Sequence, residues 1–293
     1  MDSLQNVHKP KRTLLEQLVG QLGAVPGMVA VVLGGSYASG TQNDASDLDI
    51  GLYYHEAKPF SIADIRRVAE LISDQESLTV TDFYGWGPWV NGGAWIHTAQ
   101  GKVDFLYRNV DQVKRTISDA QQGIVAHDYD QQPPYGFYSV TYLAETHICI
   151  PLYDPNNVIA DLKRSVEIYP PKLKKRVIAD SLWSAEFTIV HARGYAAQGD
   201  VYNTVGCLTR VVTNLNQVLF ALNERYFIRD KQVMQTIAGF AHLPSGYVEQ
   251  INRALACPGN DVSALAKSVG EIEEVWRSVV ALPEVDYAPK FEV

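Results

Sequence analysis

The chain has 293 residues, of which 46% are hydrophobic and 20% charged, and its formal net charge is −8. This length predicts two domains. The acidic balance argues against a nucleic-acid partner, because DNA and RNA favour a positive surface. Three widely spaced cysteines form neither a zinc pattern nor a disulfide framework, and no stretch approaches the ~20 apolar residues of a membrane span. We therefore expect a cytoplasmic protein without a membrane partner.

Helices and strands alternate through the first half of the chain. An apolar stripe at helical spacing predicts a helix over residues 11–22, and an apolar run predicts a buried strand over 28–33. A second strand is expected over about 47–54, followed by an amphipathic helix. Residues 94–98 and 102–107 flank a Gln-Gly pair typical of a hairpin. Together these elements predict an α+β domain with a mixed sheet.

The turn after the first predicted strand carries two glycines and a serine, Gly34, Gly35 and Ser36. A Gly-Gly turn exposes backbone N–H groups, and Ser36 adds a hydroxyl group where a helix can begin. This combination favours phosphate binding. Taken alone, the two glycines are more typical of an ordinary turn.

The second strand begins with the sequence Asp47-Leu48-Asp49. Side chains alternate along a strand, so Asp47 and Asp49 share one face while Leu48 points to the other. Two adjacent carboxylates repel each other unless a cation lies between them, and Mg²⁺ prefers such oxygen ligands. The alternative is a strand end with two solvated acids. A phosphate site beside a metal site predicts nucleotidyl or phosphoryl transfer.

Three tryptophans lie among glycines and prolines just before the last strand of the hairpin. We predict that Trp86, Trp89 and Trp95 form an aromatic wall for the acceptor substrate or a base. The alternative is that these large rings fill the core under a loop.

The stretch from residue 108 to residue 170 predicts two helices, over about 109–122 and 138–148, and a short strand. Glu145 on the second helix is a candidate general base, with a solvated side chain as the alternative. Tyr169-Pro170-Pro171 breaks the pattern. We therefore place a catalytic domain at 1–170 and a second domain at 171–293.

The second domain is predicted to be a bundle of about five amphipathic helices, because apolar residues recur there at steps of three and four. Arg210, Asn214 and Gln217 share a polar helix face. If that face lines a cleft between the domains, Asn223, Tyr226 and Lys231 would meet the base, ribose or triphosphate of a nucleotide, and the helix would oppose the tryptophans across the acceptor site. The alternative is a solvated helix face.

The residues Leu33-Gly34-Gly35-Ser36 and Asp47-Leu48-Asp49-Ile50 together resemble the signature of the nucleotidyltransferase superfamily of DNA polymerase beta. The resemblance implies a third carboxylate on a later strand between apolar neighbours, and Asp104 fits that position. It further implies that Asp47, Asp49 and Asp104 bind two Mg²⁺ ions, with Asp104 completing the second metal site or accepting the proton. Glu145 remains the other candidate for the base.

The two-domain arrangement resembles bacterial antibiotic-type nucleotidyltransferases, in which a C-terminal helical domain helps to hold the acceptor. The resemblance implies transfer of a nucleoside monophosphate, AMP from ATP, to a hydroxyl group of a small-molecule acceptor, with release of pyrophosphate. The acidic composition is compatible with a cationic acceptor. Two alternatives stay open: nucleotidylation of a protein partner, and a catalytically silent nucleotide-binding regulator.

Overall fold

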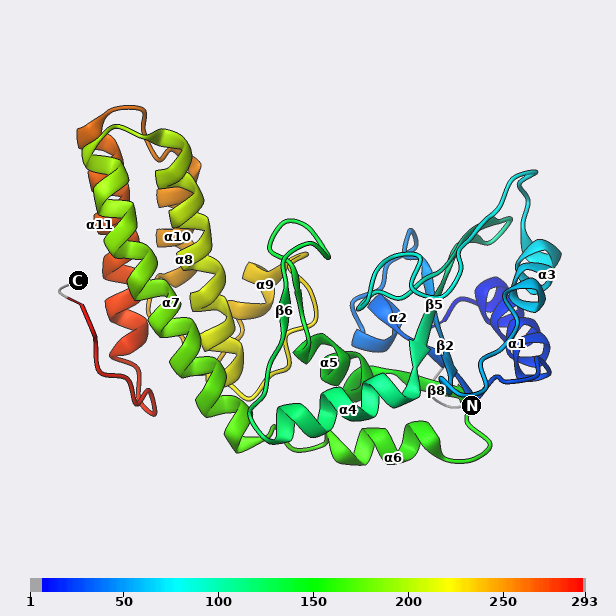
Figure 1. Ribbon diagram of the computed structural model, residues 1–293. Helices are drawn as coiled ribbons and strands as arrows, with labels where there is room; N and C mark the ends of the chain where they lie inside the picture. Colours follow the sequence, from blue (N-terminus) through cyan, green and yellow to red (C-terminus); the bar gives the residue numbers. More distant parts are fainter. Residues whose placement is uncertain (1–6, 292–293) are drawn as a thin grey trace. The chain divides into compact units, whose positions relative to one another are not determined.

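The computed structural model describes residues 7–291, and the chain forms two compact units (Figure 1). Unit 1 comprises the chain up to Ser118 together with His127–Gln131 and Ser139–Ile168. Unit 2 comprises Asp119–Ala126, Gln132–Tyr138 and the chain from Tyr169 on. The chain therefore passes from unit 1 to unit 2 for the last time between Ile168 and Tyr169, close to the boundary predicted after residue 170. The two short segments that unit 2 takes from the first half were not expected from the sequence.

Unit 1 is built on a six-stranded sheet with the order β3-β4-β5-β2-β1-β8. Strands β2 and β5 are parallel and the other neighbouring pairs are antiparallel, which confirms the predicted mixed sheet. The strands of the sheet are β1 (Ala30–Leu33), β2 (Leu48–Tyr54), β3 (Thr79–Val80), β4 (Gly93–Thr98), β5 (Gly101–Asn109) and β8 (Ile150–Tyr153). The other elements that precede residue 169 are α1 (Lys9–Gly23), α2 (Gly35–Ser39), α3 (Ile62–Ile72), α4 (Val110–Gln121), β6 (His127–Asp128), β7 (Phe137–Tyr138), α5 (Val140–Ile148) and α6 (Val158–Ser165).

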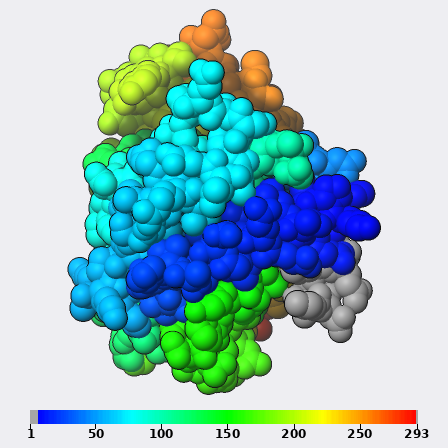
Figure 2. Space-filling model, turned by 90° about the vertical axis from the view of Figure 1, so that its right-hand side faces the viewer, coloured from blue at the N-terminus to red at the C-terminus, as the bar shows by residue number. Residues whose placement is uncertain are grey.

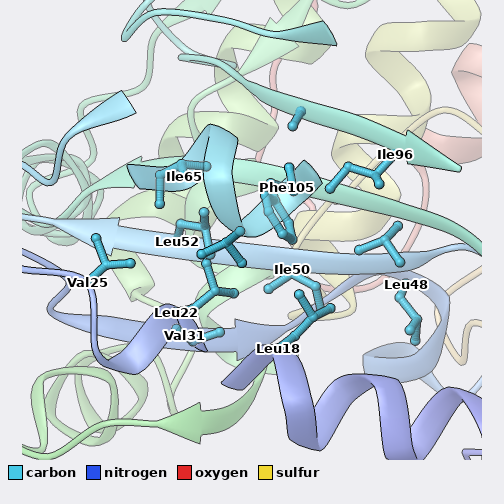
Figure 3. Close-up of a cluster of buried hydrophobic side chains, with 14 of the residues drawn as sticks. Leu18, Leu22, Val25, Val31, Leu48, Ile50, Leu52, Ile65, Ile96 and Phe105 are labelled. Carbon is cyan, nitrogen blue, oxygen red and sulfur yellow. The ribbon is translucent and has the colours of Figure 1, made fainter. Parts of the chain in front are cut away.

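The core of unit 1 lies between one face of this sheet and the helices α1 and α3. Leu18 and Leu22 of α1 and Ile65 of α3 pack against strand residues such as Ile50 and Phe105 (Figure 3). Figure 2 shows α1, in dark blue, lying across the outside of this layer. Because side chains alternate along a strand, the residues between these apolar positions point to the opposite face of the sheet. The position of the core therefore decides which face can carry a polar site.

Unit 2 is a helical bundle formed by α7 (Pro171–Ala197), α8 (Val201–Leu222), α9 (Val233–Ile237), α10 (Tyr247–Ala256) and α11 (Val262–Val280). Asp200 and Asp261 cap α8 and α11 by accepting hydrogen bonds from the backbone N–H groups of Asn203 and Ala264. The bundle agrees with the prediction for the second half of the chain.

Helix α8 is long and apolar enough to cross a membrane by composition, and it is the single such helix among the described residues. Inside the structure, however, 67% of its apolar window is buried. Leu208, Leu215 and Leu219 are all buried in unit 2. This burial is that of a core helix in a bundle, so the apolar composition of α8 is accounted for by packing.

Candidate active site

The Gly-Gly-Ser turn lies directly against β2, the strand that carries Asp49. The backbone N–H of Gly34 donates a 2.8 Å hydrogen bond to the carbonyl oxygen of Asp49. Gly35 has a φ of 56°, and a Cβ atom built on it would lie 1.7 Å from Oδ2 of Asp49. The Asp49 carboxylate therefore occupies the space that a side chain at position 35 would need. Gly34, Gly35 and Ser36 are thus brought next to the carboxylate site, as the sequence predicted.

Strand register brings the third predicted carboxylate beside Asp49. Asp49 of β2 is the Cα partner of Asp104 of β5, and Asp104 is in turn the partner of Trp95 of β4. Register partners in neighbouring strands point to the same face of a sheet. Their buried neighbours along the strands belong to the core. Asp49, Asp104 and Trp95 therefore form one row on the face opposite the core.

A second row of side chains lies two residues further along β4 and β5, on the same face of the sheet. Lys102 of β5 pairs with His97 of β4, and Asp47 directly precedes Leu48, the partner of Val103. A pocket of about 320 Å³ opens over the two rows, and its lining residues are Asp47, Trp95, Ile96, His97, Lys102 and Asp104. The pocket thus combines two predicted metal ligands, one predicted acceptor-binding ring and two basic side chains.

The electrostatic environment of Asp104 is unfavourable to its charged form. Partial burial raises the pKa of the Asp104 carboxyl above its usual range, and the nearby Asp47 carboxylate raises it further. Lys102 and His97 act in the opposite direction, and their effects are smaller. A carboxyl with a raised pKa next to a second carboxylate is suited either to proton transfer or to sharing a cation.

Replacing Asp104 by asparagine is expected to raise the free energy of unfolding at pH 7. A carboxyl whose pKa is raised in the folded state binds more protons there than in the unfolded state, so its ionisation destabilises the fold as pH rises. The gain should shrink as pH falls and should vanish below the ordinary pKa of Asp, where the carboxyl is protonated in both states. Urea denaturation of the wild type and Asp104→Asn across this pH range measures it. Glu70→Gln, which removes an exposed carboxylate of α3, is the control, and lower stability of Asp104→Asn at pH 7 would contradict the argument.

The three tryptophans of the predicted aromatic wall have different surroundings. The Trp86 and Trp95 rings stack with centroids 4.7 Å apart and an interplanar angle of 21°, and Trp95 is 53% exposed. Trp89 instead packs edge-to-face on Tyr142 of α5, whose hydroxyl donates a 2.5 Å hydrogen bond to the Trp89 carbonyl oxygen. Trp95 therefore borders the pocket with Trp86 behind it, whereas the ring of Trp89 belongs to the contact with α5.

Glu145 forms an ion pair with Arg108. The Nε and Nη2 atoms of Arg108 donate hydrogen bonds of 2.8 Å each to the two carboxylate oxygens of Glu145. Arg108 is 5% exposed and its Nη1 also donates to the carbonyl oxygens of Tyr107 and Val90. A bidentate pair of this kind uses both oxygens of the carboxylate. Since Glu145 is also absent from the pocket lining, Asp104 is the better candidate for the base.

The predicted nucleotide-binding residues of the second half lie in unit 2. The Asn223 side chain donates to the carbonyl oxygens of Leu219 and His242 and accepts from the backbone N–H of His242, so it closes the end of α8. Tyr226 stacks on Tyr169 with centroids 4.8 Å apart, and Lys231 is exposed. Their contact with a nucleotide stays a prediction.

Sequence analysis did not identify Lys102 and His97 as site residues. Neither side chain makes a hydrogen bond or ion pair with any residue in the described part of the chain, and both are exposed at the pocket. The sequence nevertheless held a signal that both residues lie near the site, because Lys102 lies two residues before Asp104 and His97 lies two residues after Trp95. Spacings of two place residues on one face of a strand.

Mg²⁺ fits the chemistry of these donors. Within residues 7–291 no group of three or more His, Cys, Asp or Glu side chains converges closely enough to form a complete metal cage. Mg²⁺ does not require one, because it commonly uses one or two carboxylates and completes its shell with water and substrate phosphates. Asp47, Asp49 and Asp104, which share one sheet face, are the residues that would hold it.

Two segments of the chain match known family models. Residues 15–83, which include the Gly-Gly-Ser turn, Asp47 and Asp49, match the family model described as "Nucleotidyltransferase domain". Residues 139–231 match a model described as "Domain of unknown function (DUF4037)". A crystal structure of a nucleotidyltransferase-like protein from Exiguobacterium sibiricum 255-15 is similar at 10% sequence identity and a TM-score of 0.45, over 92% of this chain and 74% of that one. No curated protein matches the chain. The match shows that residues 15–83 of the chain are similar to a nucleotidyltransferase domain.

Proposed function

We propose that this protein is a cytoplasmic, Mg²⁺-dependent nucleotidyltransferase that transfers AMP from ATP to a hydroxyl group of a small-molecule acceptor. The supporting observation is the register of β2 and β5, which places Asp49 beside Asp104 while the Gly-Gly turn packs on Asp49. A phosphate-binding turn in contact with a carboxylate cluster is the arrangement that nucleotidyl transfer requires.

Each residue type has a defined task in this reaction. Gly34, Gly35 and Ser36 bind the outer phosphates through backbone N–H groups and the serine hydroxyl. Asp47, Asp49 and Asp104 would hold the metal ions. The chemistry that two Mg²⁺ ions supply when bound there is stabilisation of the leaving pyrophosphate and a lower pKa of the attacking hydroxyl group.

The transfer step exchanges one phosphorus–oxygen bond for another. The acceptor oxygen forms a bond to the α-phosphorus, the bond from that phosphorus to the β-bridging oxygen breaks, and the electron pair leaves with pyrophosphate. The proton of the acceptor hydroxyl passes to a base. Asp104, the register partner of Asp49 on β5, would either complete the second metal site or accept this proton.

Mg²⁺ and ATP together are expected to raise the melting temperature of the full chain more than either does alone. The metal needs substrate phosphates to complete its shell, so the two ligands bind the folded state cooperatively. At a ligand concentration 100-fold above Kd, the gain in stability is about 2.7 kcal/mol. Differential scanning fluorimetry measures it, and a shift with ATP that EDTA leaves unchanged would contradict the metal-dependent site.

Transfer itself is tested with ATP labelled at the α-phosphate, Mg²⁺ and a panel of hydroxyl compounds. Label on a small molecule with release of pyrophosphate supports the proposal. Label on added protein would instead support nucleotidylation of a partner. Binding of nucleotide without transfer to any acceptor would support a silent regulator. Parallel reactions with labelled GTP, CTP and UTP test the preference for adenine.

A further inference from the structure

We propose that the acceptor carries an anionic group, a phosphate or a carboxylate, and that Lys102 and His97 bind this group beside Trp95. The inference rests on the proposed nucleotidyl transfer and names the class of acceptor for it. It replaces the cationic acceptor that the overall composition was compatible with, because two side chains with N–H donors, Lys102 and His97, line the β4–β5 side of the pocket.

The order of the strands separates a nucleotide side from an acceptor side. Across the sheet the order β1, β2, β5, β4 places first the Gly-Gly turn, then Asp49, then Asp104, and finally Trp95 with His97. In an in-line displacement the attacking oxygen and the leaving pyrophosphate lie on opposite sides of the phosphorus. If the outer phosphates bind at the turn after β1, the acceptor must approach from the side of β5 and β4.

Two basic side chains lie on the β4–β5 side of the pocket, whose lining also includes the carboxylates of Asp47 and Asp104. Lys102 and His97 are Cα partners next to the turn of the β4–β5 hairpin, and both line the pocket. The Lys102 ammonium has three N–H donors and no acceptor capacity, and the His97 ring has at least one N–H donor. In the described part of the chain neither side chain has a hydrogen bond or ion pair that uses this capacity. Two neighbouring donors of this kind are suited to a phosphate or a carboxylate.

The aromatic ring next to these donors supports the same assignment. Trp95 is stacked on Trp86, which holds it in place, and its other surface is available because 53% of the residue is exposed. A fixed aromatic surface beside a basic pair can bind the body of an acceptor while the basic pair holds its charged group. The acceptor hydroxyl would then be directed toward Asp104. This residue lies two residues after Lys102 on β5 and therefore on the same face of the strand.

The test uses four matched probes: glycerol, glycerol 3-phosphate, glycerate and 3-amino-1,2-propanediol. They share hydroxyl groups and differ in charge, and the two anionic probes separate a phosphate site from a carboxylate site. Binding to the full chain is measured by NMR titration, with and without saturating Mg²⁺ and a non-hydrolysable ATP analogue. We expect at least one anionic probe to bind about 10-fold or more tightly than glycerol, because a charged hydrogen bond is involved.

Substitutions assign the effect to the two residues. Lys102→Met is expected to weaken binding of the anionic probe about 10- to 100-fold, His97→Gln to weaken it less, and Lys102→Arg to retain most of it. Lys58→Met, which removes an exposed lysine outside the pocket, is the matched control. Glycerol binding should be the same in all variants, since glycerol has no charged group.

Several results would overturn the proposal. Preference of the wild type for the amine, or anionic binding unchanged in both Lys102→Met and His97→Gln, would exclude an anion subsite. If Lys102 only offsets the charge of Asp104, Lys102→Met would change kcat equally for anionic and neutral acceptors and leave their KM ratio unchanged. Failure of ATP and Mg²⁺ binding would instead overturn the proposed transferase function, and the probe titrations without nucleotide would still decide whether the subsite exists.

Discussion

Replacing Asp49 by asparagine is expected to abolish nucleotidyl transfer while the protein stays folded. Asp49 lies between the Gly-Gly turn and Asp104, so its carboxylate is the one that joins the phosphate site to the other carboxylates. Loss of a residue that only supports a metal ligand costs about 10- to 100-fold. Loss of a ligand itself should therefore cost more than about 100-fold in turnover.

The amide of asparagine keeps the shape of Asp49 and removes its charge. Removal of a charge from a cluster of like charges relieves repulsion, so the melting temperature without ligands should not fall. Turnover with labelled ATP and Mg²⁺, together with circular dichroism, separates loss of chemistry from loss of structure. Glu70→Gln on α3 removes an exposed carboxylate on the same unit and should retain full activity. Near wild-type turnover of Asp49→Asn would remove Asp49 from the catalytic site.

Replacing Gly35 by alanine is expected to inactivate the enzyme through Asp49. The new Cβ atom would lie 1.7 Å from Oδ2 and 2.5 Å from Cγ of Asp49, so the carboxylate would have to move. The backbone at position 35 has a φ of 56°, a conformation that costs an alanine about 1–2 kcal/mol. We expect loss of stability of this order and a loss of turnover similar to that of Asp49→Asn.

A matched substitution in the same unit shows whether the effect is local. Gly20 lies within α1, and a Cβ atom built on it meets no atom within 4 Å. Gly20→Ala should therefore stabilise the protein by about 0.5–1 kcal/mol, because alanine favours a helix over glycine, and should leave turnover unchanged. Urea denaturation and the labelled-ATP assay measure both variants. Full activity of Gly35→Ala would show that Asp49 can move without loss of function.

Local patterns in the sequence were sufficient to predict most of the fold. The alternation around Leu48 and Asp49 placed the leucine in the core and the aspartate on the opposite face, and the structure agrees. Helical periodicity located the bundle of unit 2, and Tyr169-Pro170-Pro171 marked the start of its first long helix. These features depend on residues close together in the chain, so their physical causes can be read directly from spacing and residue type.

The sequence by itself also determined which groups are available for the proposed chemistry, because Gly34-Gly35-Ser36 and Asp47-Leu48-Asp49 carry the groups proposed to bind phosphate and metal. Only the tertiary structure decided what surrounds those donors. The parallel pairing of β2 with β5 makes Asp104 the neighbour of Asp49. The hairpin adds Lys102 and His97 to the pocket, and a long-range ion pair holds Glu145 on Arg108. The β2–β5 pairing and the Arg108–Glu145 ion pair join segments far apart in the chain, and these partners are set by strand register and packing rather than by local propensity.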